Sequence, residues 1–490
     1  MNNRDIYVDQ DFIDKLLEAF CNVDKLKSTY RNSQKASVPL KHCDKHILYL
    51  LLQQSYRIKN QACKSGKPLD CTVIERLDDI IALSREKFYA YPYKDVPAHW
   101  RLVYWEASLL KVTALVLGEL GANAPHILRP SCIDSIVNTI DMAIIMAGNH
   151  LPVHTQKGID MVMESFSTID HPSVISRTTS RDKRQKIDHT RDWSDHFPEN
   201  TIQLPQITRQ VSRKKNLSFT AFERHINNPS DPDLGAEPLI ISGSLEHWPA
   251  RNSRPWSSPS YLMAQTIGGR RLVPIELGRS YVDEGWGQKI ISFKQFLDTY
   301  IIRDSKADEM STGYLAQHNL FSQIPNLRHD IAIPDYCFAS APSPHKSCPL
   351  LDKYLETSKL NEPLLNAWFG PAGTITPLHT DPYHNILAQV VGKKYVRLYA
   401  PRESSNIYAR GLEMGGIDMG NTSIVDVGKF IGLDGTTNEQ EEARKDFPLF
   451  ENAQFVDCIL EEGDCLYIPV GWWHYVRSLS ISFSVSFWFN

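Results

Sequence analysis

A short segment near residue 380 carries side chains that could hold a metal ion. His379 and Asp381 lie two positions apart, and in an extended chain residues with that spacing project from the same face. His474, in the segment GWWHYV, offers a third donor. Two imidazoles and one carboxylate that leave coordination positions open are the ligand set of non-haem Fe(II) sites. The triplet alone also fits a capped turn with a surface histidine. His384 is a rival ligand, which we interpret as a hydrogen-bonding residue.

A lysine on the apolar face of a predicted strand indicates an anionic ligand beside this segment. Residues 385–391 form a mostly apolar run, Gly392 begins a turn, and residues 394–399 read as the return strand. Lys394 shares a face with Val396 of that strand, and a buried ammonium is costly unless an anion meets it. An edge lysine that reaches water is the alternative. Beside a metal, the natural partner is a carboxylate of an organic cosubstrate.

The C-terminal segments predict further strands around the same site. The run CILEEGDCLYIP, at 458–469, reads as two strands joined by a turn, and it leads directly to His474. Residues 480–488 alternate between an apolar face and a face of three serines and Trp488. A face of small side chains leaves room for a ligand inside a barrel, although a half-exposed strand would show the same alternation.

Together these motifs resemble the Jumonji-C (JmjC) branch of the 2-oxoglutarate oxygenases. The similar segments are PLHTDP with Asn385, GKKY, EEGDCLYIPVGWWHYVRSL, SFSVSFW, GYLAQH at 313–318, IPDYC at 333–337 and NAWFGPAGTITPLH at 366–379. They extend over roughly residues 239–490. The resemblance implies an α+β chain, in which a helical N-terminal region precedes a double-stranded β-helix, the cupin-like jelly roll.

The resemblance also implies a cofactor set and a role for each site residue. Fe(II) would bind His379, Asp381 and His474, and cysteines are missing from this cluster, which disfavours zinc. 2-Oxoglutarate would chelate the metal and place its distal carboxylate on Lys394; molecular oxygen is the co-reactant. Each of the remaining positions could instead be structural. The residues implied to complete the cosubstrate site are Tyr314, Thr376 and Asn385, and Trp488, on the serine face of the last strand, could form a wall of the same pocket.

Two further residues predict the substrate. Glu276, in LVPIELG, and Trp368, in NAWFG, are placed by the resemblance beside the pocket. A carboxylate can accept paired N–H groups from a guanidinium, and an aromatic face can stack on it. We therefore expect an arginyl hydroxylase whose partner is a protein or peptide, with ribosomal, chromatin-associated and histone proteins as candidates. The alternatives are removal of N-methyl groups from histone lysine by the same iron chemistry, and a non-catalytic scaffold that binds partners through its helices.

The N-terminal region, residues 1–165, is predicted to be helical. Asp9 can cap a helix that carries apolar residues at a spacing of four, and Pro97 can begin another. Ser131 and Asp134 resemble a capping box. We expect stacked antiparallel helix pairs that serve as an interaction surface or a packing partner.

A polar linker is predicted between the two regions, at residues 166–203, with the oxygenase domain at 204–490. The linker contains a short basic cluster at 181–186, which is compatible with a nuclear-import signal or with a solvated segment. Within the oxygenase domain, residues near 430–446 read as an acidic surface insertion.

Composition excludes several classes of protein. Hydrophobic residues make up 42% and charged residues 22% of the 490 residues, and the net charge is -4; these values give no reason to expect nucleic-acid binding. Nine cysteines occur without a C-x-x-C pair, which argues against a disulfide framework and indicates a nuclear or cytoplasmic location. We expect no signal peptide and no membrane span.

Overall fold

The computed structural model describes residues 6–31, 40, 42–62, 70–92, 95–120, 126–148, 151–167, 195–199, 201–283, 285–302, 312–413 and 418–490. The chain forms two compact units. The helical unit contains the N-terminal helices together with Met263–Leu272 and Ser292–Lys294, and the barrel unit contains the rest of the C-terminal region. Most of the predicted linker, including its basic cluster, lies outside the described residues.

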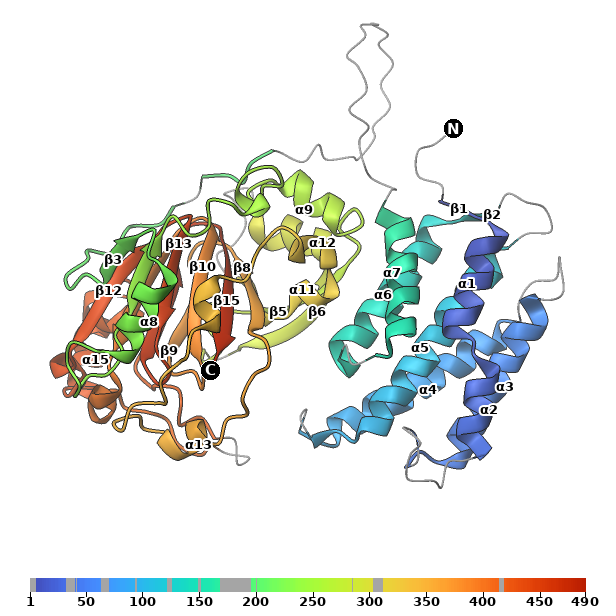
Figure 1. Ribbon diagram of the computed structural model, residues 1–490, viewed down its shortest axis with the longest axis horizontal. Helices are drawn as coiled ribbons and strands as arrows, with labels where there is room; N and C mark the ends of the chain where they lie inside the picture. Colours follow the sequence, from blue (N-terminus) through green and yellow to red (C-terminus); the bar gives the residue numbers. More distant parts are fainter. Residues whose placement is uncertain are drawn as a thin grey trace, which may run out of the picture. The chain divides into compact units, whose positions relative to one another are not determined.

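The helical unit consists of amphipathic helices around one apolar core, as predicted (Figure 1). Asp9 caps the first helix by accepting a hydrogen bond from the backbone N–H of Phe12 at 2.8 Å, which confirms the predicted cap. A short antiparallel β-pair, β1 (Ile6–Val8) with β2 (His126–Leu128), joins the segment before the first helix to the segment between the fifth and sixth helices. The helices are α1 (Gln10–Phe20), α2 (Val23–Arg31), α3 (Lys45–Ala62), α4 (Thr72–Tyr89), α5 (Ala98–Glu119), α6 (Pro130–Ala147) and α7 (Val153–Ser167).

Helix α6 differs from expectation at its start. The predicted capping box is wrong: Pro130 is the first helical residue, the cap is Arg129, and its side chain makes no capping hydrogen bond. Asp134 instead pairs with Arg270 at 2.9 Å. Among the described residues, α6 is the one helix whose length and composition would allow it to cross a membrane. Its apolar residues pack in the core of the helical unit, where Ile136 is fully buried.

The helical unit also includes a segment from the C-terminal half of the chain. Ile267 is 4% exposed and belongs to the same apolar core as the helices. Arg271 and Asp141 of α6 form a buried ion pair, with 2.7 Å between Nη2 and Oδ1. The same carboxylate accepts a hydrogen bond from the backbone N–H of Leu272 at 2.7 Å. Distant parts of the sequence therefore build this unit together.

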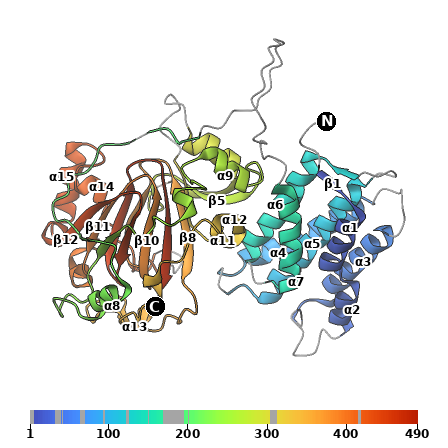
Figure 2. The same ribbon diagram turned by 45° about the horizontal axis from the view of Figure 1, so that its top comes forward.

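The barrel unit contains two antiparallel-rich sheets that face each other, and this confirms the predicted jelly roll (Figures 1 and 2). The larger sheet has the order β3-β4-β13-β10-β15-β8-β7-β5-β6, and the smaller one β12-β11-β14-β9. The strands are β3 (Ser212–Lys215), β4 (Leu239–Ser242), β5 (Leu272–Leu277), β6 (Gly287–Ser292), β7 (Gly313–His318), β8 (Leu364–Gly370), β9 (Ile375–His379), β10 (His384–Val391), β11 (Lys394–Tyr399), β12 (Phe455–Leu460), β13 (Asp464–Ile468), β14 (Trp473–Ser478) and β15 (Ser482–Phe489).

Apolar side chains from both sheets form the core between them. Leu387 of β10 and Leu466 of β13 meet Val396 of β11 and Val476 of β14 in one cluster. This arrangement follows from the alternation of the sequence, because every second residue of each strand points inward. Gly392 turns the chain between β10 and β11 at a φ of +72°, a conformation that glycine adopts without steric cost.

The segment between β11 and β12 covers the outer face of the smaller sheet. Phe430 and Phe450 from this segment pack on Tyr399 of β11, in a cluster that also contains Tyr475 of β14. Only its last helix, α15, is without buried residues, as expected for an acidic surface. The short helices of the C-terminal half are α8 (Phe219–Asn227), α9 (Pro259–Gln265), α10 (Phe293–Phe296), α11 (Leu320–Gln323), α12 (Pro325–Arg328), α13 (Leu351–Leu355), α14 (Val427–Phe430) and α15 (Thr437–Asp446).

Candidate metal centre and its pocket

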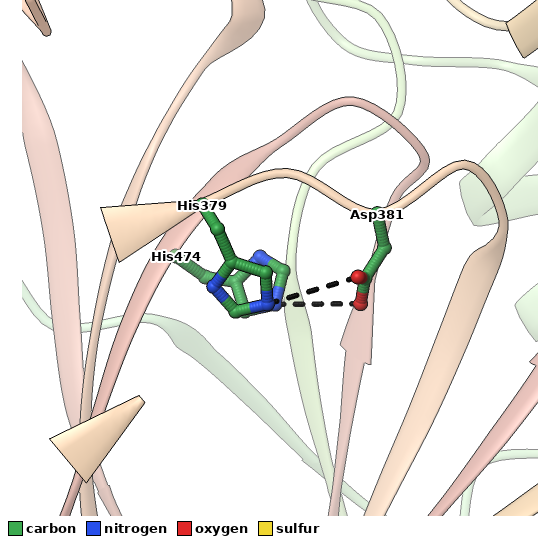
Figure 3. A group of neighbouring side chains, drawn as sticks. All are labelled: His379, Asp381 and His474. Carbon is green, nitrogen blue, oxygen red and sulfur yellow. Dashed lines mark ion pairs between the residues drawn. The ribbon is translucent and has the colours of Figure 1, made fainter. Parts of the chain in front are cut away.

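Two strands and one turn bring the three candidate ligands together. His379 is the last residue of β9, and the antiparallel register places it directly opposite His474 of β14. Asp381 follows in the turn after β9. Its carboxylate oxygens lie 3.7 Å from Nε2 of His379 and 3.5 Å from Nε2 of His474. Figure 3 shows the carboxylate facing both rings. Ligand atoms of the three residues all lie within 4.8 Å of one another.

Backbone hydrogen bonds fix how each imidazole presents its nitrogens. Nδ1 of His379 lies 2.8 Å from the carbonyl oxygen of Pro377, and Nδ1 of His474 lies 3.0 Å from that of Trp472. A carbonyl oxygen can only accept, so each Nδ1 carries the proton and each Nε2 keeps a lone pair. Both lone pairs are on the side of Asp381. This orientation is the one that metal-binding histidines usually have.

The electrostatics of the cluster favour a cation. Burial, together with the neighbouring His474, lowers the pKa of His379 to about 4. Burial alone would raise the pKa of Asp381, but the contacts with His474 and His379 outweigh it, and the pKa is lowered. At neutral pH the site therefore contains a neutral His379 and a carboxylate. Both are in the protonation state that a divalent metal requires.

His384, the rival ligand, has a different role. Its ring nitrogens lie 2.8 Å from the hydroxyl of Tyr467 and 2.9 Å from the carbonyl oxygen of Pro342. Both nitrogens are therefore engaged in hydrogen bonds. The residue is not part of the metal-binding cluster found among the described residues.

The segment between β11 and β12 braces the metal turn. The backbone N–H of Thr380 donates to the carbonyl oxygen of Asn421 at 2.9 Å. The backbone N–H of Ser423 donates to the carbonyl oxygen of Leu378 at 2.8 Å. The Thr380 hydroxyl lies 2.6 Å from that of Tyr354. These bonds hold the backbone on both sides of His379, so the insertion contributes to the geometry of the site.

An inner cavity of about 30 Å³ lies beside the triad. Lys394, 1% exposed, points into it from β11, and its Nζ lies 3.3 Å from the Tyr314 hydroxyl. Burial lowers the pKa of Lys394 to about 7. Among the described residues no carboxylate pairs with this ammonium, and Oδ1 of Asn385 is buried without a hydrogen-bond partner. Thr376 lines the same cavity.

These inner residues fit a small dianion that binds a metal at one end. A buried ammonium can pair with one carboxylate, and the neighbouring hydroxyls can donate to it. An oxygen of the metal-binding end would be next to the triad. The cavity thus brings together the residues predicted to bind the cosubstrate, except Trp488.

A larger, outer cavity of about 340 Å³ shares His379 and Asp381 with the inner one. Glu276 and Trp368, predicted from the sequence to bind substrate, both line it. Burial raises the pKa of Glu276, although a hydrogen bond from Trp286 opposes the shift. The indole N–H of Trp368 donates to Oγ of Ser486 at 3.0 Å. This bond fixes the ring so that it forms one wall of the cavity.

Trp488 lines this outer cavity and does not line the inner one. Its ring stacks on Tyr383, with 5.7 Å between the centroids, and its buried indole N–H has no hydrogen-bond partner among the described residues.

Two residues of the outer cavity were not found from the sequence. Tyr281 follows β5, and Asn421 comes from the segment between β11 and β12. Burial raises the pKa of Tyr281 to about 12, so its hydroxyl stays protonated. Neither residue lies in a motif near the metal ligands in sequence, and only the fold brings them to the site.

Comparison with known proteins gives consistent similarities. The family model described as the cupin-like domain matches residues 234–490. Lysine-specific demethylase 8 of Danio rerio is 36% identical over 422 residues, which are 86% of this chain and 89% of that protein. Lysine-specific demethylase JMJ30 of Arabidopsis thaliana is 43% identical over 58% of this chain and 55% of its own length.

A more distant relative has a name that states a different activity. The bifunctional peptidase and (3S)-lysyl hydroxylase JMJD7 of Homo sapiens is 25% identical over 52% of this chain and 77% of its own length. The region matched by the cupin-like model contains every residue that lines the two cavities.

Proposed function

Because this chain belongs to the cupin-like JmjC family of 2-oxoglutarate oxygenases, we propose that it hydroxylates an arginine side chain of a protein substrate. The observation that carries this proposal is the outer cavity, where the Glu276 carboxylate and the Trp368 ring line one space with His379 and Asp381. A guanidinium can donate paired hydrogen bonds to the carboxylate while its plane stacks on the indole. This contact would place C–H bonds of the same side chain near the metal.

In this proposal His379, Asp381 and His474 hold Fe(II), and Lys394 pairs with the distal carboxylate of 2-oxoglutarate. Bound iron, with 2-oxoglutarate and molecular oxygen, supplies the oxidising power that a C–H bond requires. The protein orients both ligands and keeps water out. The Tyr314 hydroxyl and the Asn385 amide orient the cosubstrate from the walls. Trp488 remains a proposed cosubstrate contact, made from the outer side through its unpaired N–H.

Lysine demethylation is the second candidate, and one observation favours it. Besides Glu276, the outer cavity has an aromatic lining of Tyr281, Tyr314, Trp368 and Trp488, and aromatic cages bind methylated ammonium groups. Two of the relatives are named lysine-specific demethylases. A carboxyl group that can accept paired N–H groups favours the guanidinium instead.

A scaffold without catalysis is less consistent with the site, because such proteins usually lose a ligand, and here the triad and Lys394 are all present. The proposed partner is a histone, chromatin-associated or ribosomal protein, and the proposed location is the nucleus or the cytoplasm.

The experiment incubates purified full-length protein with Fe(II), 2-oxoglutarate and arginine or N-methyl-lysine peptides. Product mass and released formaldehyde are both measured. A stable gain of one oxygen on arginine without formaldehyde supports the proposal. Glu276→Gln should weaken this reaction and preserve 2-oxoglutarate turnover without substrate. Formaldehyde release from methyl-lysine that is insensitive to Glu276→Gln would overturn the proposal in favour of demethylation.

A further inference from the structure

Arg279 lies in the turn after β5, between two residues of the outer cavity. Its guanidinium contacts three carboxylates: Nε lies 3.2 Å from Asp283, Nη2 lies 2.9 Å from Asp426, and Nη1 lies 2.8 Å from Asp434. Asp283 belongs to the same turn as Arg279. Asp426 and Asp434 belong to the segment between β11 and β12. Arg279 therefore ties the turn after β5 to a part of the chain about 150 residues away in sequence, as the separations of 147 and 155 positions show.

Asp434 connects this turn to the strand that carries a metal ligand. One of its carboxylate oxygens, Oδ2, also accepts from Nη1 of Arg477 at 2.5 Å. Arg477 is on β14, three residues after His474. The side chain of Asp434 is 15% exposed and that of Arg477 is 11% exposed, so water screens this contact less than it screens a surface pair. We call Arg279, Asp434 and Arg477 the clamp.

The chain leaves room for the clamp at one glycine. A Cβ atom on Gly428 of α14 would lie 2.0 Å from Oδ2 of Asp434. Any larger residue at this position would push the carboxylate away from both guanidinium groups. The φ angle of Gly428 is not positive, so its backbone conformation does not require glycine. The close approach of the carboxylate does require it.

A backbone hydrogen bond also connects the clamped turn to β9, the strand that ends at His379. The N–H of Ile375, the first residue of β9, donates to the carbonyl oxygen of Arg279 at 3.0 Å. Thr376, the next residue, lines both cavities. Three residues before Arg279 is Glu276, and two residues after it is Tyr281, and both line the outer cavity. The Tyr281 hydroxyl lies 3.5 Å from that of Thr422.

We propose that the clamp positions the substrate-binding segment. Arg279, held by Asp434, fixes the segment that contains Glu276 and Tyr281 against the strands that carry the metal ligands. Glu276 and Tyr281, which the clamp holds, line the outer cavity and do not line the inner one, so the clamp acts on the protein substrate and not on the cosubstrate. The segment between β11 and β12, whose latter part reads as an acidic insertion in the sequence, thus determines the shape of the substrate side. This inference rests on the proposed function, because it assigns the outer cavity to the substrate.

Two variants disturb the clamp in different ways. Asp434→Asn keeps the size of the side chain and removes its charge. Gly428→Ala leaves every charged residue in place and displaces the carboxylate sterically. Glu442→Gln is the matched control, because it removes one negative charge from exposed α15 in the same segment. All variants are made in the full-length protein.

The first measurement needs no substrate. Hydrogen exchange of the backbone amides in residues 273–283 is compared between the variants and the wild type. Both clamp variants should exchange faster in this segment, and Glu442→Gln should not. Unchanged exchange in Asp434→Asn and Gly428→Ala would overturn the proposal.

The second measurement separates positioning from general damage to the fold. Turnover of 2-oxoglutarate without substrate should be unchanged in both clamp variants. KM for an arginine peptide that the wild type hydroxylates should rise by about tenfold, which is the scale of one lost charge-assisted hydrogen bond, while kcat changes less. An equal loss of both activities would indicate a merely structural role and contradict the proposal. If the wild type hydroxylates no arginine peptide, the proposed function fails, and the exchange measurement still decides whether the clamp holds the segment.

Discussion

His379 and His474 face each other across the antiparallel pair of β9 and β14, with 4.1 Å between their ring centroids. Two imidazolium ions would repel at this distance, and burial together with this neighbour lowers the pKa of His379 to about 4. The strand register thus fixes two neutral ligands side by side, and the turn after β9 adds the carboxylate. Because both imidazoles are on strands, their positions depend little on loop conformation, whereas the position of the carboxylate depends on the turn after β9.

Asp381→Ala should abolish the oxidation of 2-oxoglutarate. The change removes the only carboxylate of the metal-binding cluster found among the described residues, and we expect a loss of more than about 100-fold, because even residues that only orient ligands account for 10–100-fold. Succinate formation in a metal-defined assay is the measurement. Asp418→Ala, which removes an exposed carboxylate paired with Lys353, is the control and should retain activity. Undiminished succinate formation by Asp381→Ala would remove Asp381 from the metal site.

Lys394→Ala should weaken 2-oxoglutarate binding far more than metal binding. The Lys394 ammonium is buried, and its hydrogen-bond partner among the described residues is the Tyr314 hydroxyl, so an incoming carboxylate would provide its missing counter-charge. A charge-assisted hydrogen bond contributes about 1.5–3 kcal/mol, which corresponds to a Kd increase of about tenfold or more. The neighbouring Lys393 is 44% exposed and pairs with Glu461, so Lys393→Ala is a matched control that should leave Kd unchanged. Equal Kd values for wild type and Lys394→Ala would refute the assignment.

The affinity for 2-oxoglutarate should fall as the pH rises above about 7. Burial lowers the pKa of Lys394 to about 7 in the folded protein, so above this pH the free site loses the charge that the anion needs. Binding then requires uptake of a proton, and Kd should increase by up to about tenfold per pH unit. Calorimetry with a redox-inert metal in place of iron measures Kd and proton uptake together. A Kd that is flat between pH 7 and 9 would contradict a depressed pKa.

The lowered pKa of Lys394 should make the ligand-free protein more stable as the pH rises, although it weakens 2-oxoglutarate binding. Below about pH 7 both the folded and the unfolded protein bind the Lys394 proton, and the full cost of burying the charge is present. Between about pH 7 and the ordinary value of 10.5, the folded state has lost this proton while the unfolded state keeps it. Stability therefore rises with pH across this range. In Lys394→Met this contribution to the pH dependence of the unfolding free energy should disappear.

Local sequence patterns predicted those parts of the site that depend on strand periodicity. His379, Asp381 and Lys394 were found because alternation assigns each of them to a face, and the return strand after Gly392 follows from one turn residue. Tyr281 and Asn421 were not found, because they reach the outer cavity through a turn and a long insertion without periodicity. The role of Asp434 depends on a contact 155 positions away with Arg279, and no local pattern indicates such a contact.

The helical region illustrates a second limit of local patterns. Asp9 was correctly predicted as a cap, because it accepts a hydrogen bond from an N–H only three residues away and a local pattern therefore includes both partners. Asp134 was predicted incorrectly as the partner of Ser131 in a capping box, since Pro130 already starts α6 and an arginine from outside the helices pairs with the carboxylate. The division of the chain at residue 203 stays a prediction, and the presence of Ile267 in the helical core bears on it.

A fragment that begins at residue 204 should be less soluble than the full-length protein. It would contain Ile267, which is 4% exposed in the core of the helical unit, but it would lack the helices that cover this side chain. Size-exclusion chromatography at increasing concentration measures the difference. Ile267→Asn in the fragment is the control and should recover solubility, because asparagine tolerates the φ of +56° at this position. A fragment that is monodisperse without this change would show that the covering is dispensable.

Asp141→Ala should destabilise the helical unit strongly. The Asp141 carboxylate is 0% exposed and accepts from Nε and Nη2 of Arg271 at 3.0 and 2.7 Å, and its loss leaves a buried guanidinium without this counter-charge. Removing one partner of a buried ion pair costs about 3–5 kcal/mol, and denaturant unfolding of the full-length protein measures the change. Asp134→Ala is the matched control on the same helix, because its carboxylate also pairs with an arginine of this segment but is 53% exposed; exposed pairs contribute at most about 1 kcal/mol. Similar losses in the two variants would mean that burial does not determine the contribution of Asp141, and that the segment 263–272 is held to the helices by its apolar contacts alone.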